Sequence, residues 1–217
     1  MPHPVFTPTE VALLTSTNYI LSPKDHAQLS TPDDQFTRLS WEMVKEIIRE
    51  NRLQELKRLP SDLRRYILWC ETVRRDYDGG VMGYILRERL RWDNLGEEEV
   101  EKMRRNDVKI LTNDWPYGLT PDIIHLVVWT KIPIPIAEDG DLTPDSRRRI
   151  DEFVDKVFSG AVGKENVVWF KNWRSLQSVP SVEHMHVLVR GATEEMLKEW
   201  VEGPWGTKGM ETEKLRN

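Results

Sequence analysis

The sequence predicts an α+β fold, in which a helical N-terminal half packs on an antiparallel sheet. Two observations support this prediction. Apolar residues recur every three or four positions over much of the first half, which is the period of an amphipathic helix. The second half instead contains short β-branched and aromatic runs bounded by Pro, Gly and Asn, which are typical of strands. Helices followed by strands, with few helices between them, favour a segregated arrangement.

The chain length fits one domain with an appendage. The 217 residues are 39% hydrophobic and 31% charged, which is ordinary globular composition. Residues 1–36 are rich in Pro, Thr, Ser and Asp and are expected to form a flexible N-terminal arm. We assign residues 37–205 to a single α+β domain and residues 206–217 to a tail. Within this domain the helical part covers residues 37–106 and the sheet part residues 107–205.

Start and stop signals divide the helical half. Ser40 and Ser61-Asp62 are N-cap residues, whereas Pro60 and Gly79-Gly80 interrupt the helical pattern. The predicted helices run from Ser40 to Pro60, from Ser61 to Gly79, from Val81 to Trp92 and from Glu97 to Arg105.

The second half contains four predicted strands and two helices. The strands are Val108 to Leu111, Ile123 to Trp129, Val167 to Phe170 and Met185 to Val189. The helices open at Thr143 and at Thr193, each a capping residue ahead of an apolar stripe. The first two strands are expected to pair as a hairpin.

Charge and hydropathy exclude several classes of partner. The net charge of −5 gives no general attraction to phosphate backbones, so we expect no nucleic-acid binding. No run approaches the roughly 20 apolar residues of a membrane span, and no basic leader precedes an apolar stretch. Cys70 is the only cysteine, so no intramolecular disulfide can form. We therefore expect a soluble cytoplasmic protein without membrane contact.

Two histidines in the last predicted strand are the strongest candidates for chemistry. His184 and His186 are separated by one residue, so the period of two directs both imidazoles to one face of the sheet. Met185, Val187 and Val189 then face the core. Paired imidazoles can hold a metal, bind phosphate, or act as nucleophile and positioning group. The alternative is a plain solvent face with alternating polar residues.

The segments around these histidines resemble the histidine-triad (HIT) superfamily. The resemblance rests on Asn113-Asp114-Trp115-Pro116-Tyr117, His125-Leu126-Val127-Val128 and Ser181-Val182-Glu183-His184-Met185-His186. It implies a HIT-like sheet and a nucleoside pocket. By this resemblance Asn113 or Asp114 meets the ribose with Trp115 and His125 in the pocket, Asn172 and Ser181 hold the phosphate, His184 orients, and His186 is the nucleophile.

The sequence departs from the HIT pattern at one position. The third histidine of the triad is replaced by Leu188, which cannot donate or relay a proton. A different acid or a binding-only pocket is therefore expected. Lys131, Arg174 and Arg190 are candidate substitutes, and Arg190 has the same strand parity as His186.

Beyond these segments, the chain is similar to the fungal N-acetylglucosamine-induced protein family, whose domain has no assigned reaction. The resemblance covers roughly residues 40–205 and rests on five blocks. These are Pro60 to Tyr66, Tyr84 to Trp92, Asn113 to Tyr117, His125 to Trp129, and Trp169 to Asn172 ahead of the histidine pair. It implies a cytoplasmic fungal protein linked to N-acetylglucosamine response or metabolism.

Four functions follow from these patterns. The first is a HIT-like hydrolase or nucleotidyltransferase acting through His186 on a nucleotide, nucleotide sugar or amino-sugar phosphate. The second is a non-catalytic binder of the same ligands, which Leu188 favours. The third is a metal enzyme that adds Glu183 or Asp114 to the histidines, although Glu183 has the wrong strand parity. The fourth is a structural or interaction role. We expect no cofactor and no metal. Because members of the HIT superfamily are often dimers, the resemblance also implies a homodimer as one expected assembly.

Overall fold

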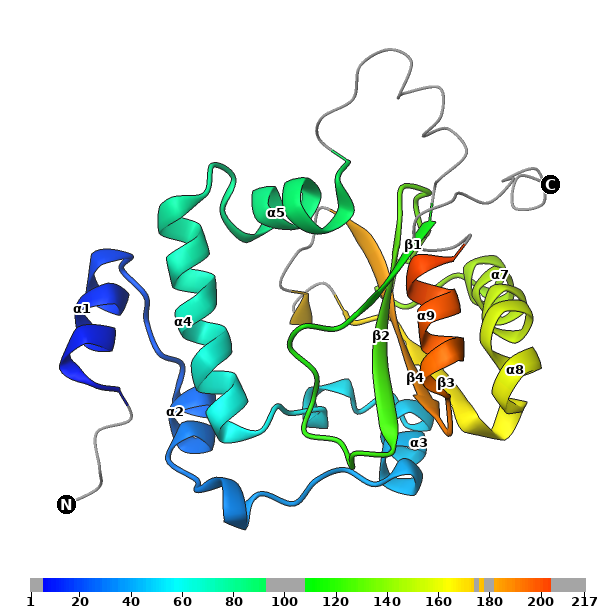
Figure 1. The fold of residues 1–217 in the computed structure, drawn as a ribbon, viewed down its shortest axis with the longest axis horizontal. Coiled ribbons are helices and arrows are strands. Elements are labelled where there is room, and N and C mark those ends of the chain that lie inside the picture. The colour runs from blue at the N-terminus through cyan, green and yellow to red at the C-terminus, as the bar shows by residue number, and fades with distance from the viewer. Residues whose placement is uncertain (1–5, 93–107, 174–175, 178–181, 204–217) are drawn as a thin grey trace. The chain divides into compact units, whose positions relative to one another are not determined.

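The computed structural model describes residues 6–92, 108–173, 176–177 and 182–203 (Figure 1). The chain divides into two compact units. The first takes residues 1–39, 56–94 and 115–119, and the second takes the remainder. The predicted helix from Glu97 to Arg105 lies outside the described residues. The assignment of a single domain to residues 37–205 stays a prediction.

The first unit is helical. Its helices α1 (Pro8–Ser16) and α2 (Pro23–Leu29) both pack on α4 (Pro60–Asp76), and α5 (Gly80–Tyr84) runs on into a π-helical segment at Ile85–Leu90 (Figure 1). A capping box between Thr7 and Glu10 begins α1. The sequence predicted no regular element in residues 1–36, so α1 and α2 are additions to that prediction.

Two predicted helix boundaries are corrected. The first helix, expected to continue to Pro60, is α3 (Trp41–Arg49); it ends there because Asn51 adopts a left-handed φ of 54°. The second begins at Pro60 instead of Ser61, since proline suits the first helical position and lacks the N–H that would stay unpaired. The Ser61 amide instead donates to Asp33 Oδ1 at 2.9 Å.

The second unit contains a four-stranded antiparallel sheet. Its strands β1 (Val108–Thr112), β2 (Ile123–Thr130), β3 (Val167–Phe170) and β4 (Glu183–Arg190) occur in the order β1-β2-β4-β3. All three pairings are antiparallel, and β1 and β2 form the expected hairpin-like pair. The predicted strands and the α+β class with an antiparallel sheet are confirmed.

Helices cover one face of this sheet. Figure 1 shows α7 (Pro144–Val154) and α9 (Glu194–Glu202) beside it, and short helical segments at Asp155–Ser159, Gly160–Val162 and Lys164–Asn166 connect α7 to β3. Alternate strand residues enter the core with side chains from both helices. This core contains Ile110, Leu126, Val128, Met185, Val187, Val189, Ile150, Phe153, Phe158 and Trp200. The sheet positions between these residues must therefore face the other way.

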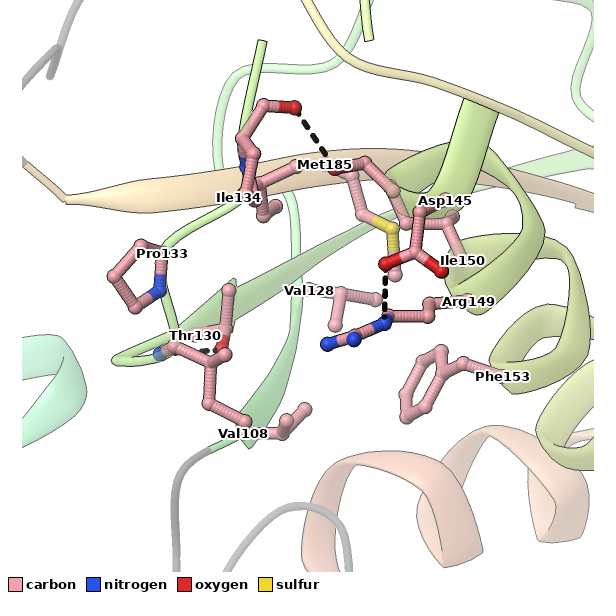
Figure 2. A pocket seen from close by; sticks show the side chains of 13 residues that line it. Val108, Val128, Thr130, Pro133, Ile134, Asp145, Arg149, Ile150, Phe153 and Met185 are labelled. Carbon is pink, nitrogen blue, oxygen red and sulfur yellow. Dashed lines mark hydrogen bonds and ion pairs between the residues drawn. The ribbon is translucent and has the colours of Figure 1, made fainter. Parts of the chain in front are cut away.

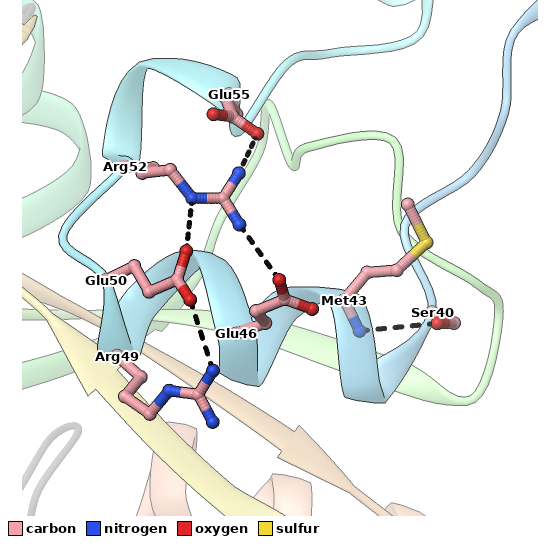
Figure 3. Close-up of polar contacts among 7 residues, drawn as sticks. All are labelled: Ser40, Met43, Glu46, Arg49, Glu50, Arg52 and Glu55. Atoms are coloured by element: carbon pink, nitrogen blue, oxygen red, sulfur yellow. Dashed lines mark hydrogen bonds and ion pairs between the residues drawn. The ribbon is translucent and has the colours of Figure 1, made fainter.

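The helix α3 packs against β3 in the same unit, near the start of β3 and the end of β4. The Trp41 indole donates to the Glu165 carbonyl at 3.1 Å, and the Arg190 guanidinium lies 5.3 Å from the centre of the Trp41 ring. Arg52 bonds the carboxylates of Glu46, Glu50 and Glu55 after the end of α3 (Figure 3). These contacts hold the turn that contains Asn51.

No helix within the described ranges is long and apolar enough to cross a membrane.

The sheet core gives a direct stability prediction. Leu126→Ala removes a side chain that is 0% exposed in the core, so it should lower the free energy of unfolding by about 2–5 kcal/mol. Met43→Ala on α3 is the control, since that side chain is 40% exposed and the change should stay within about 0.5 kcal/mol. Urea unfolding followed by circular dichroism measures both, and equal losses would contradict the assigned core.

Candidate functional site

Strand register brings three histidines to one face of the sheet. In the β2–β4 pairing, His184 lies opposite Trp129, His186 opposite Val127, and His125 opposite Leu188. Residues one position away on each strand enter the core, so all three imidazoles lie on the face away from α7 and α9. His125, His184 and His186 are only 3%, 6% and 7% exposed. We call these three residues the histidine cluster.

His125 lies across the sheet from Leu188 and contacts His186. Leu188 is fully buried on β4, and its direct cross-strand neighbour on β2 is His125. The Nε2 atom of His125 lies 2.9 Å from Nδ1 of His186. The cluster therefore gathers three imidazoles although the strand pattern contains two. The sequence placed His125 in the pocket, but only the strand register shows that it contacts His186.

A hydrogen-bonded chain runs through His125 and His186. Asn113 Nδ2 lies 3.2 Å from His125 Nε2, and Asn172 Nδ2 lies 3.2 Å from His186 Nε2. When the Asn172 amide donates, His186 Nε2 accepts, and His186 carries its proton on Nδ1 and donates it to His125. Both ring nitrogens of His186 are thereby in use. Attack by His186 on phosphorus would first require Asn172 to move.

His184 is held in a different way. Its Nδ1–H donates to the Val182 carbonyl at 2.7 Å, which leaves the lone pair of the neutral ring on Nε2. Trp129 lies against the ring at 4.6 Å between centroids and an interplanar angle of 32°. Burial lowers the pKa of His184, and the nearby Lys171 charge lowers it further. A fixed, neutral imidazole whose lone pair lies on Nε2 is the form that a nucleophile or base requires.

Aromatic contacts also orient the His186 ring. Phe170, opposite His186 in the β3–β4 pairing, stacks on that imidazole at 4.9 Å and 13°. His184 meets His186 edge to face, with 5.6 Å between centroids. The orientation of each imidazole is therefore set by packing as well as by hydrogen bonds.

Lys171 is a functional candidate that the sequence did not single out. Its side chain is only 10% exposed, and Nζ pairs with Glu183 at 3.2 Å. It is the residue between Phe170 and Asn172, both of which contact His186. This position directly after β3 was the available signal. The result is an ammonium group close enough to His184 to affect its pKa.

Of the other predicted site residues, Arg190 and Trp115 contact residues outside the histidine cluster. Arg190 shares the face of His186, but its guanidinium donates to Asn166 Oδ1 at 3.0 Å and lies over Trp41. Asp114 is exposed. Trp115 belongs to the first unit and packs against Tyr66 and Trp69 there. Lys131 is exposed, whereas Ser181 and Arg174 lie outside the described residues.

Two cavities among the described residues of the second unit bear on the site. One of about 620 Å³ is lined in part by Asn172, Lys171 and Glu183, so it reaches the histidine cluster through Asn172. The other, of about 90 Å³, lies on the core face between the sheet and α7, among Val128, Met185 and Phe153 (Figure 2). Its volume is far below the roughly 300–1,000 Å³ of typical ligand sites. The larger cavity is therefore the candidate binding space.

The arrangement of possible metal ligands bears on the metal-enzyme hypothesis. Within the part of the chain that the structure describes, no group of three His, Cys, Asp or Glu side chains is arranged to hold a metal ion. The histidine cluster is instead joined by direct contacts between its imidazoles.

The electrostatics of His184 can be measured directly. Proton NMR should show His184 titrating below the usual histidine value of about 6.5, so its ring is neutral at pH 7 and gains a proton only in acid. Lys171→Met removes a positive charge that disfavours the imidazolium, so the pKa of His184 should rise. Lys164→Met, which removes an exposed cation paired with Asp155, should leave it unchanged. An unaltered pKa of His184 in Lys171→Met would contradict the proximity of the two groups.

The chain is similar to known proteins over most of its length. Residues 40–190 match the model of a family described as a protein of unknown function, DUF3605. The chain is 28% identical over 195 residues to N-acetylglucosamine-induced protein 1 of Candida albicans, which covers 80% of this chain and 75% of that protein. It is 30% identical over 158 residues to an uncharacterized protein of Saccharomyces cerevisiae, covering 69% of this chain and 77% of that protein.

A solved structure extends the similarity to the fold. The crystal structure of HTC1 superposes with a TM-score of 0.61 at 25% sequence identity, and covers 79% of this chain and 98% of that chain.

Proposed function

The chain belongs to the DUF3605 family, and on that premise we propose that it serves the response to N-acetylglucosamine, or its metabolism, through the histidine cluster. The biological setting comes from the name of the Candida albicans relative. The chemistry comes from the site. We propose a HIT-like phosphoester hydrolase or transferase that acts on a nucleotide sugar or an amino-sugar phosphate.

In this proposal His184 is the nucleophile. Its Nε2 lone pair attacks phosphorus, the bond from phosphorus to the leaving oxygen breaks, and that oxygen takes a proton from solvent. Water, or a second hydroxyl in a transferase, then attacks the phosphohistidine and releases a proton as the bond from phosphorus to Nε2 breaks. The observation that carries the proposal is the 2.7 Å bond from Nδ1 to the Val182 carbonyl, which fixes the ring with Nε2 as its acceptor.

The roles of the two strand histidines are thereby exchanged relative to those that the HIT resemblance implies. His186 has one nitrogen against His125 and the other against Asn172, so it is suited to moving a proton along the chain. His125 provides the imidazole that Leu188 lacks. The Lys171 ammonium supplies positive charge for a phosphoryl group beside His184.

A non-catalytic binder is the second candidate. All three imidazoles are at least nine-tenths buried, and an enclosed polar network can orient a ligand without reacting with it. In that case the cluster recognises the phosphate, and no bond is broken.

Phosphorus NMR tests the proposal. The purified protein is mixed with nucleotide sugars, dinucleotides and N-acetylglucosamine phosphates, and a new phosphorus signal is expected with one of them. His184→Asn should reduce turnover by at least about a thousandfold because it removes the attacking atom. His186→Asn and His125→Asn should also slow the reaction. His26→Asn, on an exposed residue of α2, is the matched control and should retain full activity.

The covalent intermediate identifies the nucleophile. Protein denatured in alkali during turnover should carry phosphate on His184 when its peptides are analysed by mass spectrometry. Phosphate on His186 would overturn the role given to His184. Line broadening without any product, across the whole panel, would instead favour the binding protein.

A further inference from the structure

The larger cavity adjoins the histidine cluster. Its volume of about 620 Å³ falls within the roughly 300–1,000 Å³ of small-molecule sites. Asn172 belongs to both places, because it lines the cavity and its Nδ2 lies 3.2 Å from His186 Nε2. A ligand in the cavity would therefore lie against Asn172, which contacts His186.

The cavity wall nearest the cluster contains the ion pair of Lys171 with Glu183. Lys171 lines it from the end of β3, and its side chain is nine-tenths buried. Its pairing with Glu183 leaves the local charge balanced, but a phosphate dianion would be a stronger partner than a half-exposed carboxylate. This wall suits one phosphate group.

A rigid acidic turn forms another part of the wall. The Ala137 amide donates to the Asp141 backbone carbonyl at 2.7 Å, and the Gly140 amide donates to the Ala137 carbonyl at 3.0 Å. Gly140 takes a φ of 85° that favours glycine. Asp141 is paired with Arg147 at 3.1 Å. The exposed Asp139 carboxylate accepts the Asp141 amide at 3.0 Å.

The remaining lining is suited to a sugar ring. Trp173 provides an indole, on which the apolar face of a pyranose can lie, and Gln177 and Asn51 provide amides. Carboxylates such as Asp139 accept hydrogen bonds from sugar hydroxyls. The same carboxylate repels a second phosphate, as a diphosphate-linked nucleotide would bring.

We propose that this cavity binds a pyranose sugar that carries a single phosphate. The phosphate lies toward Lys171 and Asn172, on the side of the histidine cluster, and the ring lies over Trp173 with its hydroxyls directed to Asp139. The placement of the phosphate rests on the proposed function of the histidine cluster, and the selection against nucleotide sugars rests on the cavity alone.

Calorimetric titration of the full chain tests this assignment. The probes are N-acetylglucosamine 6-phosphate, N-acetylglucosamine, UDP-N-acetylglucosamine and inorganic phosphate, each added to the His184→Asn variant so that no turnover interferes. The sugar monophosphate should bind about tenfold or more tightly than each other probe. Adding Asp139→Asn should weaken the sugar monophosphate about tenfold, leave inorganic phosphate unchanged, and strengthen the nucleotide sugar.

Matched variants separate the two ends of the ligand. Lys171→Met should weaken both the sugar monophosphate and inorganic phosphate, because it removes the charge that both share. Trp173→Leu should weaken the sugar monophosphate and the free sugar only. Asp155→Asn, which removes an exposed carboxylate paired with Lys164, is the control and should change none of them. Circular dichroism confirms that each variant is folded.

The outcomes distinguish this inference from the proposed function. Tighter binding of the nucleotide sugar, no effect of Asp139→Asn on the sugar monophosphate, or no binding of any probe by folded protein would each overturn the cavity assignment. Binding as expected, with no product in the phosphorus NMR experiment, would leave the cavity standing and remove the catalytic role. A phosphohistidine formed from a nucleotide sugar, with no effect of Asp139→Asn, would do the reverse.

Discussion

The antiparallel pairing of β2 with β4 is the constraint on which the rest of the second unit depends. It aligns eight residue pairs, from Ile123 with Arg190 to Thr130 with Glu183. Since side chains alternate across a sheet, this one register sends Leu126, Val128 and Val187 into the core and the three histidines to the other face. A shift of one residue would exchange the two sets. Core packing and the candidate chemistry are therefore set by the same register.

Burying three imidazoles has an energetic cost that the structure offsets locally. A buried polar group without a partner loses about 1–3 kcal/mol, so partners must lie close by. His125 and His186 are partners for each other, Asn113 contacts His125, Asn172 contacts His186, and His184 donates to a backbone carbonyl. Burial lowers the pKa of His184, and its neutral ring keeps the desolvation cost small. The same contacts orient the rings, so stability and site geometry have a common origin.

The histidine cluster draws its side chains from two neighbouring strands. Along β4, the alternation of His184 and His186 ends at Leu188, and a one-dimensional pattern stops there. Across the sheet, the residue opposite Leu188 is His125. Motif spacing describes positions on one strand, whereas chemistry depends on which side chains meet in space. An apolar residue at a motif position therefore does not by itself remove the group from the site.

Local patterns were enough to predict the α+β class, the four strands and the shared face of His184 and His186, because strand periodicity and capping residues act over a few neighbours. Helix ends were less predictable. The end of α3 depends on the left-handed conformation of Asn51, and Pro60, which can either stop one helix or begin the next, begins α4. The contact between His125 and His186, the nearness of Lys171 to His184 and the cavity beside Asn172 required the folded chain. Each joins residues that are distant in sequence, or depends on strand register and side-chain packing, and no local preference encodes such contacts.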